Sequence, residues 1–252
     1  MKQTEIIQIL ETIAPPHMAE DFDTGRIGLI LDLADNIDTI GVSLDASQAV
    51  FIEAAKAGVD LLITHHTPIF RPLTKISKNF AITLSIALEN NISLYTMHTN
   101  YDAADAGVND VLAEILGLSA IRKIKDEPIG RIGTIKHTST QQFAQLVSEK
   151  LDTPVRYVGD HDIETVMVIG GSGLGDEYID LAIKEGANVL VSGEMRHSAS
   201  LRGNEISLID ATHYATENPA MKRLCERLGK ILYDAGVKIV FIDSNPAVVS
   251  II

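Results

Sequence analysis

Residues 58–70 read GVDLLITHHTPIF. Four of the five positions in 59–63 are apolar, a pattern typical of a strand that is buried on both faces in a parallel sheet. Because Pro68 cannot continue a central strand, His65 and His66 should lie in a loop at the strand's carboxyl end, where ligands of open α/β sheets bind. A hydrogen-bonded loop residue is the simpler interpretation for one histidine. Two adjacent imidazoles favour a metal or catalytic site.

The bulk properties of the chain limit its class. With 252 residues it can form one large or two small domains around a substantial core. The formal net charge of −13 argues against general nucleic-acid affinity, because phosphate binding depends on Lys and Arg. No apolar run approaches the roughly 18 residues of a membrane helix, and the first residues lack the features of a signal peptide. The single cysteine, Cys225, cannot form an internal disulfide, so we expect a cytoplasmic protein.

The expected order of helices and strands repeats along the chain. Four pairs of segments match in the same order: 37–42 with 163–169, 56–63 with 184–191, 92–94 with 206–208, and 115–117 with 227–229. Strands separated by helices imply largely parallel pairing, with helices covering the sheet. The charged stretch 118–130 is typical of a junction. We therefore predict an α/β fold of two similar α/β/α units from an internal duplication, residues 1–125 and 126–252, with a metal site in the cleft between them.

Each half supplies a histidine and a carboxylate four residues apart, His98 with Asp102 and His213 with Glu217, after matching strands. On a helix this spacing would stack the two side chains on one face. The Asn-Pro step at 218–219 is typical of an N-cap and the first helical residue, so we expect both pairs to lie on loops. A local hydrogen bond explains either pair alone. Both pairs together with the doublet favour a shared site.

Local signals elsewhere leave several assignments open. Asp45 and Ser47 are both plausible N-caps of the helix that ends at Gly58. The segment 170–175, GGSGLG, lies between a strand and a helix and could bind phosphate through backbone N–H groups, but a tight turn is an equal alternative.

Three further side chains also stay undecided at this stage. Glu194 and His197 follow the strand that corresponds to the doublet strand, so they line the site or are solvated. Cys225 falls on the apolar stripe of the last helix, which favours a buried structural thiol.

A set of five motifs resembles one known family. The motifs are 64–70 (THHTPIF), 98–104 (HTNYDAA), 107–110 (GVND), 192–194 (SGE) and 213–217 (HYATE). Together they resemble the Nif-three-like family, also described as GTP cyclohydrolase type 2 homologues or dinuclear-metal-centre hexameric proteins. The resemblance runs from about residue 20 to Asn245-Pro246 and is to the short form, without an inserted domain.

The resemblance implies a centre of two divalent metal ions. Carried over position by position, the metal ligands are His65, His66, Asp102, His213 and Glu217. His98 would stand beside them on the substrate side, as the catalytic proton shuttle. Mixed nitrogen and oxygen ligation suits Zn, Fe, Mn, Co or Ni and does not select among them. The resemblance also implies a toroidal homohexamer, a trimer of dimers, with the sites facing an interior cavity.

We therefore expect a dinuclear-metal-dependent hydrolase that uses a metal-activated water, with GTP ring opening as the activity implied by the resemblance. A non-catalytic metal-binding adaptor or metal chaperone is the alternative, and a structural hexamer for a protein partner is a third. A basic element to hold a triphosphate is not obvious, because the cationic side chains are scattered. They are Arg26, Arg71, Lys75, Arg196 and Arg202.

Overall fold

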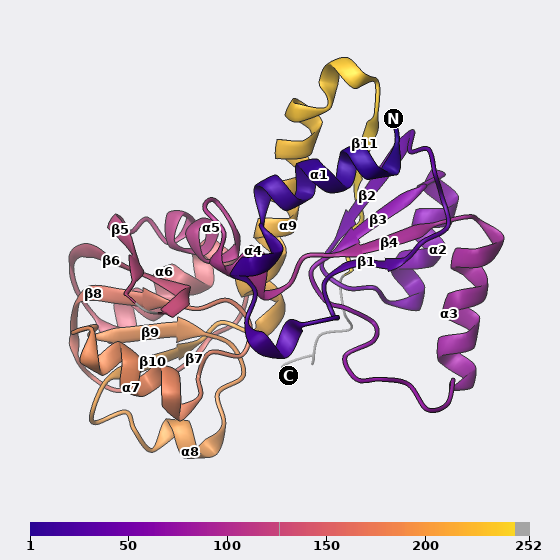
Figure 1. Cartoon of the computed structure of the whole chain (residues 1–252). Coiled ribbons are helices and arrows are strands. Elements are labelled where there is room, and N and C mark those ends of the chain that lie inside the picture. Colours follow the sequence, from indigo (N-terminus) through magenta and orange to yellow (C-terminus); the bar gives the residue numbers. More distant parts are fainter. Residues whose placement is uncertain (126, 245–252) are drawn as a thin grey trace. The chain divides into compact units, whose positions relative to one another are not determined.

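The computed structural model describes residues 1–125 and 127–244 and divides the chain into two compact units (Figure 1). Unit 1 consists of residues 1–104 and 221–244, and unit 2 of residues 105–220. Each unit contains one β-sheet with helices, so the predicted α/β fold with two similar units is confirmed. No helix in the described ranges is both long and apolar enough to cross a bilayer.

The sheet of unit 1 has the strand order β1-β4-β3-β2-β11. Its strands are β1 (Gly28–Leu31), β2 (Thr39–Ser43), β3 (Leu61–Thr64), β4 (Ser93–Thr96) and β11 (Lys238–Phe241). β11, β2, β3 and β4 pair in parallel, and β1 runs antiparallel to β4. Every residue of β3 is buried, as the apolar run before the doublet predicts, and every residue of β4 is buried as well.

The helices of unit 1 include α2, whose two ends lie at the capping residues that the sequence predicts. These helices are α1 (Gln3–Ile13), α2 (Gln48–Ala57), α3 (Lys78–Glu89), α4 (Thr99–Ala103) and the later part of α9 (His213–Ile231), with short 3-10 turns at Pro16–Met18, Asp21–Asp23 and Tyr233–Ala235. Ser47 caps α2 by accepting a hydrogen bond from the backbone N–H of Val50 at 3.3 Å. Gly58 ends the same helix with a left-handed φ of 67°, so both predicted ends are confirmed.

The sheet of unit 2 has the order β5-β6-β8-β9-β10-β7. Its strands are β5 (Ser119–Ile124), β6 (Glu127–Ser139), β7 (Arg156–Val158), β8 (Asp162–Val168), β9 (Val189–Ser192) and β10 (Ser207–Asp210). β8, β9 and β10 pair in parallel, whereas β5–β6, β6–β8 and β7–β10 are antiparallel. The expectation of largely parallel sheets therefore holds for unit 1, while unit 2 is mixed because a hairpin extends its sheet.

Both faces of the unit 2 sheet are covered. Its helices are α5 (Val108–Ile115), α6 (Thr140–Leu151), α7 (Asp176–Lys184) and α8 (His197–Ser200). Successive residues of β8 point to opposite faces. Val166 and Val168 pack with residues of α5 and α6, and Met167 packs with residues of α7. The sheet is thus fixed between two apolar layers.

The two units share one strand arrangement. The antiparallel and parallel neighbours in β7-β10-β9-β8 repeat those in β1-β4-β3-β2. In both units, a side chain just before the central strand (β3 or β9) accepts hydrogen bonds from the backbone of the neighbouring strand segment. Asp60 Oδ2 accepts hydrogen bonds from the N–H groups of residues 38 and 39 at 2.8 and 2.9 Å. Asn188 Oδ1 accepts hydrogen bonds from the N–H groups of residues 164 and 165 at 3.1 and 2.8 Å.

The division of the chain differs from the expected 1–125 and 126–252 in two ways. Residues 119–124 pair with β6, so much of the stretch expected as a junction is a hairpin of unit 2. Within α9 the chain returns to unit 1 at residue 221, and β11 then pairs with β2. Apolar patterning marks a strand but does not say which sheet it joins. Residues 126 and 245–252, which include the Asn245-Pro246 end of the motif set, lie outside the described residues.

Candidate metal centre

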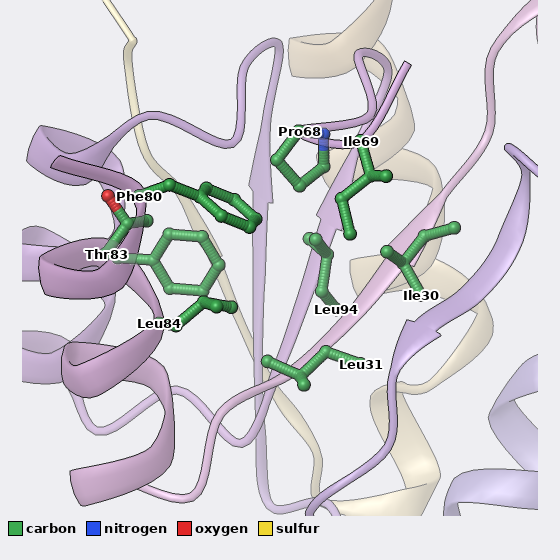
Figure 2. A pocket seen from close by; sticks show the side chains of 9 residues that line it. Ile30, Leu31, Pro68, Ile69, Phe80, Thr83, Leu84 and Leu94 are labelled. Carbon is green, nitrogen blue, oxygen red and sulfur yellow. The ribbon is translucent and has the colours of Figure 1, made fainter. Parts of the chain in front are cut away.

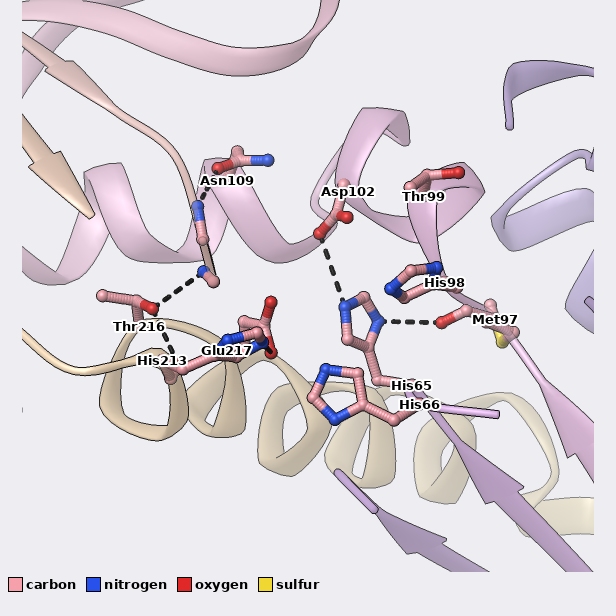
Figure 3. Close-up of polar contacts among 12 residues, drawn as sticks. His65, His66, Met97, His98, Thr99, Asp102, Asn109, His213, Thr216 and Glu217 are labelled. Atoms are coloured by element: carbon pink, nitrogen blue, oxygen red, sulfur yellow. Dashed lines mark hydrogen bonds and ion pairs between the residues drawn. The ribbon is translucent and has the colours of Figure 1, made fainter. Parts of the chain in front are cut away.

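His65 is held in a fixed orientation at the end of β3. The ring is buried, and its Nδ1 lies 2.8 Å from the carbonyl oxygen of Met97 (Figure 3). A carbonyl only accepts, so Nδ1 carries a proton and donates it, which leaves Nε2 as the basic nitrogen of the neutral ring. Nε2 points toward Asp102, 3.7 Å from its Oδ1. A ring fixed in this way by an oxygen acceptor is typical of histidines that bind metals.

His66 and His98 are oriented by the same device. His66 Nδ1 lies 2.7 Å from Asp45 Oδ1, and His98 Nδ1 lies 2.8 Å from Asp23 Oδ2. In each pair the carboxylate accepts from Nδ1 and turns Nε2 away from itself. Asp45 therefore orients a histidine rather than capping α2, a role that the local N-cap signal concealed.

Asp23 is fully buried at the end of a short 3-10 turn. Burial acts to raise the pKa of this carboxyl group, but hydrogen bonds from His98 and Thr99 and the charge of His98 act against it. The net effect lowers the pKa of Asp23 below its usual value, so the group stays a carboxylate. The backbone N–H of Thr99 donates to it at 3.1 Å. Sequence reasoning missed Asp23, because an acidic loop gives no sign of which carboxylate turns inward.

The three imidazoles of unit 1 gather at the carboxyl ends of β3 and β4. The ring centroids of His65 lie 5.0 Å from those of both His66 and His98, and the latter two are 5.9 Å apart. One ligand atom from each of the three lies within 4.8 Å of the others. Such a group of nitrogen donors, with the Asp102 carboxylate beside it, could hold a divalent transition metal.

His213 and Glu217 form the corresponding pair of unit 2. His213 Nε2 lies 3.0 Å from Glu217 Oε2, and His213 Nδ1 lies 2.6 Å from Glu194 Oε1. Glu217 is 3% exposed. Both ring nitrogens thus face carboxylate oxygens at distances that require a proton or a metal ion between the atoms. The Glu194 side chain is 53% exposed and contacts His213, so it is solvated and also lies beside a candidate ligand.

Both His–carboxylate pairs lie at helix starts, so the expectation that they lie on loops is wrong. α9 begins at His213 and continues through Pro219. Thr212 precedes α9, and its Oγ1 accepts from the N–H of residue 215 at 3.3 Å, which closes the first turn ahead of the proline. In unit 1, His98 is the N-cap of α4, and the Asp102 N–H donates to the His98 carbonyl at 3.1 Å. The Asn-Pro signal is local and was outweighed by this capping.

Asp210 fixes the loop that carries Glu194. It lies at the end of β10 and its Oδ1 accepts from the N–H groups of Glu194 and Thr212 at 3.2 and 3.0 Å. Its Oδ2 accepts from the N–H of Met195 at 3.0 Å and pairs with the Arg156 guanidinium. One buried carboxylate thus holds both segments that converge on His213.

The glycine-rich segment 170–175 serves the His213–Glu217 pair. Three of its N–H groups donate to side chains of unit 2: Gly170 to Asn109 at 2.7 Å, Gly171 to Thr216 at 3.0 Å and Gly173 to Ser192 at 2.8 Å. These N–H groups are therefore used within the unit, which favours the tight turn over phosphate binding. A Cβ on Gly171 would overlap Glu217 Oε1 and lie 3.1 Å from His213 Nε2. Glycine at this position lets the loop approach the pair.

The sequence also left open the roles of His197 and Cys225. His197 is exposed at the start of α8, and its carbonyl accepts from the Ser200 hydroxyl at 2.7 Å, so the solvated interpretation fits it. Cys225 is half-buried on α9, and burial raises the pKa of its thiol. A thiol with a raised pKa is a poor nucleophile, which fits the structural role expected for it.

An apolar cavity of about 50 Å³ lies in unit 1 between α3 and the sheet (Figure 2). It is lined by Ile30, Leu31, Phe51, Pro68, Ile69, Phe80, Thr83, Leu84 and Leu94. Ligand pockets usually enclose about 300–1,000 Å³, so this space is too small for a nucleotide. It contains no group that ionises near neutral pH. This cavity therefore offers no acid, base or metal ligand, whereas the histidine and carboxylate clusters do.

Fold and clusters together define a two-unit α/β protein with histidine and carboxylate groups that could bind a metal. The family model of Duf34/NIF3 (NGG1p interacting factor 3) matches residues 1–247. A Methanocaldococcus jannaschii protein named GTP cyclohydrolase 1 type 2 homolog is 34% identical over 241 residues, covering 92% of this chain and 96% of its own. The chain belongs to the Duf34/NIF3 family.

Further relatives and solved structures point to the same family. NIF3-like protein 1 of Drosophila melanogaster is 28% identical over 269 residues, with 98% of this chain and 89% of its own covered. The structure of reduced HcgD from Methanocaldococcus jannaschii matches with a TM-score of 0.81 at 32% identity, covering 96% of this chain and 97% of its own. A hypothetical protein of Staphylococcus aureus matches with a TM-score of 0.90 at 25% identity, covering 100% and 99%. The predicted family is thereby confirmed.

Proposed function

We propose that this protein is a hydrolase that uses two divalent metal ions to activate water and opens the ring of a guanine nucleotide. The ligands would be those implied by the family motifs, His65, His66, Asp102, His213 and Glu217. The observation that carries the proposal is the orientation of the imidazoles. In His65, His66, His98 and His213, Nδ1 faces an oxygen acceptor. The curated relatives named GTP cyclohydrolase 1 type 2 homolog support the choice of substrate class.

The donor set fits divalent transition metals. Imidazole nitrogen and carboxylate oxygen together suit Zn, Fe, Mn, Co or Ni, and the oxygen acceptors behind the rings raise the basicity of the donor nitrogens. When bound, such ions act as Lewis acids that lower the pKa of a water molecule toward about 7. The residues of the chain then have to orient the substrate and accept the proton.

His98 would accept that proton at Nε2. Its Nδ1 is engaged by Asp23, so Nε2 is the nitrogen that can take part in proton transfer. The buried Asp23 carboxylate would stabilise the imidazolium that forms and hold the ring in position while the proton is transferred. His98 could later return the proton to the leaving nitrogen of the opened ring. This role makes His98 a catalytic residue and Asp23 a positioning residue.

The assembly and location of the protein belong to the same proposal. We propose a toroidal homohexamer, a trimer of dimers, in the cytoplasm, because the family motifs imply this assembly. Light scattering coupled to size-exclusion chromatography measures the mass directly. A mass of six chains of 27.3 kDa each is expected, and a monomer or dimer at micromolar concentration would contradict it.

The test is the turnover of GTP and of a phosphoester panel by protein loaded separately with each metal. His65→Ala and Glu217→Ala should abolish turnover and metal loading, whereas His137→Ala, which removes an exposed histidine, should change neither. Anomalous scattering from crystals of the loaded protein identifies the ions. Tight metal binding without turnover of any substrate would favour the adaptor or chaperone instead. Unimpaired partner binding by metal-free variants would favour a structural scaffold.

A further inference from the structure

Two large aromatic side chains of unit 1 are exposed next to the imidazole cluster. Phe22 is 44% exposed and Phe70 is 47% exposed, and their ring centroids lie 6.2 Å apart with the planes tilted by 49°. Exposed single hydrophobic residues are common, but two phenylalanines in contact at the surface present a larger aromatic surface than either ring alone. The proposed hydrolysis makes no use of either ring.

Arg26 lies over this pair. Its guanidinium carbon is 4.4 Å from the ring centroid of Phe70 and 5.8 Å from that of Phe22. One guanidinium N–H donates to the backbone carbonyl of Phe22. The guanidinium is thus held by aromatic faces and a carbonyl, which leave its charge uncompensated. Within the described ranges Arg26 makes no ion pair, although the chain carries a net charge of −13.

The aromatic pair and the imidazoles come from the same segments of the chain. The Phe22 ring stands edge-on to the His98 ring, with centroids 6.3 Å apart and planes at 73°. Phe22 also directly precedes Asp23, which fixes His98. Phe70 follows the doublet in the loop after β3. A molecule that packs against the exposed part of these two rings would therefore lie close to His98 and to the Arg26 guanidinium.

We propose that Phe22, Phe70 and Arg26 form a recognition site for a planar aromatic anion. A flat heteroaromatic ring would pack on the phenylalanines, and its phosphate or carboxylate group would bind the Arg26 guanidinium. Aromatic packing tolerates many rings, because every such ring has a π-face. This inference assigns the residues that would hold the substrate of the hydrolase proposed above. It rests on that function only for the reaction, since binding can be measured without turnover.

The experiment measures the dissociation constants of four probes with the metal-loaded protein, and again after chelation. Guanosine 5′-monophosphate carries ring and phosphate, 1-naphthoate carries ring and carboxylate, guanosine carries the ring alone and ribose 5-phosphate carries the anion alone. Wild-type protein should bind at least one of the first two probes about tenfold more tightly than the last two. Binding of only the phosphate or only the carboxylate probe identifies the anion and supports the proposal.

Two substitutions separate the contributions of ring and charge. Phe22→Leu should weaken the ring-bearing probes about tenfold and leave ribose 5-phosphate unchanged. Arg26→Gln should weaken the anionic probes about tenfold and leave guanosine unchanged. Tyr233→Leu and Arg122→Gln remove an exposed aromatic and an exposed cation elsewhere and should change nothing. Thermal unfolding curves that match the wild type show that each variant is folded.

The outcomes for this inference and for the proposed function can be told apart. Equal affinity of the wild type for all four probes, or equal effects of the control variants, would overturn the aromatic-anion site. Turnover of GTP that both Phe22→Leu and Arg26→Gln leave unchanged would overturn the site and leave the hydrolase standing. Ring- and charge-dependent binding without turnover of any substrate would support the site and contradict the hydrolase.

Discussion

The two units build the same strands and then end them with different chemistry. β3 runs into His65 and His66, whereas β9, its counterpart, runs into Gly193 and Glu194. Glu194 of unit 2 takes the position that His66 has in unit 1. Its carboxylate orients the imidazole of His213, which follows the next strand, β10. The strands and their hydrogen-bonded ties repeat, and the loops do not. The two units therefore differ in the chemistry of the loops that a common frame of strands places.

The two His–carboxylate pairs look equivalent in sequence and are one residue out of register in the fold. Thr96 lies opposite Thr64 in the first sheet, and Asp210 lies opposite Ser192 in the second. His98 comes two residues after its strand position and caps α4, whereas His213 comes three residues after its own and is the first residue of α9. Equal spacing within a pair thus does not make the pairs superimposable.

Gly171→Ala should destabilise unit 2 next to the His213–Glu217 pair, and it should have the largest effect of the substitutions considered. The new Cβ would overlap the Glu217 carboxylate, at a backbone φ of 74° that side chains rarely adopt. Overpacking and backbone strain together should lower the free energy of unfolding by about 3 kcal/mol or more. Urea denaturation followed by circular dichroism measures the loss.

Two other glycines serve as controls for that substitution. Gly58→Ala adds a Cβ at a φ of 67° with no atom within 4 Å, so strain alone should cost about 1 kcal/mol. Gly175→Ala meets no atom within 4 Å and has a φ of −84°, so a change of only a few tenths of a kcal/mol is expected. If Gly171→Ala costs no more than Gly58→Ala, close approach to Glu217 is not what requires glycine.

Asp45→Ala and Glu194→Ala test whether the orienting carboxylates of the two units do the same work. Each removes the oxygen that accepts from Nδ1 of a proposed ligand, His66 or His213. Loss of such a partner typically weakens metal affinity about 10–100-fold. Competition with a chromogenic chelator measures the affinity. Asp162→Ala, next to the exposed His137, is the control and should have no effect, and wild-type affinity in Asp45→Ala would remove it from the metal centre.

The sequence singled out the histidines of the candidate site but not the roles of the carboxylates that orient them. A histidine doublet at the end of an apolar run can be recognised from the sequence alone, because the strand and its end are local features. Asp23 reaches His98 across 75 residues, and Asp45 reaches His66 across 21. Their roles depend on which loops meet, and an aspartate ahead of a helix gives the same local signal as an N-cap.

For the fold, too, the sequence predicted local features but not contacts between distant segments. The repeat of apolar segments predicted two α/β units, because each strand and helix carries its own periodicity. The return of β11 to the first sheet was not predictable, since an edge strand of four residues carries no label for its partner. The start of α9 was missed because a helix that continues through Pro219 depends on capping by Thr212, seven residues earlier.

Asp60→Ala and Asn188→Ala compare the two equivalent ties directly. Each removes an acceptor for two backbone N–H groups, so each should destabilise its own unit by about 1–2 kcal/mol. Asp60→Asn keeps an acceptor oxygen and should cost less. Amide hydrogen exchange at Thr39 and Thr165 reports the two units separately. Equal loss of protection at both amides in either variant would show that the units do not open independently.

Thr83→Val should have the smallest effect on the free energy of unfolding. It tests whether the two sheets differ in how a helix covers them. α3 follows β3 and precedes β4 in the chain and spans 12 residues, whereas its counterpart α8 spans four residues. Of these two helices, only α3 contributes residues to the lining of the apolar cavity. Thr83 lines that cavity, and its hydroxyl donates to the Asn79 carbonyl at 3.2 Å. Replacing the hydroxyl by a methyl group adds apolar burial and should raise the free energy of unfolding by about 0.5 kcal/mol.

Thr12→Val is the matched control for that substitution. Thr12 donates to the carbonyl of Gln8 at 2.8 Å, in the same i to i−4 geometry, on the exposed face of α1. The added methyl group there meets water, so the lost hydrogen bond is not offset and stability should stay the same or fall slightly. A gain in Thr12→Val equal to that in Thr83→Val would assign the effect to helix propensity, and the cavity would then contribute nothing to the difference between the units.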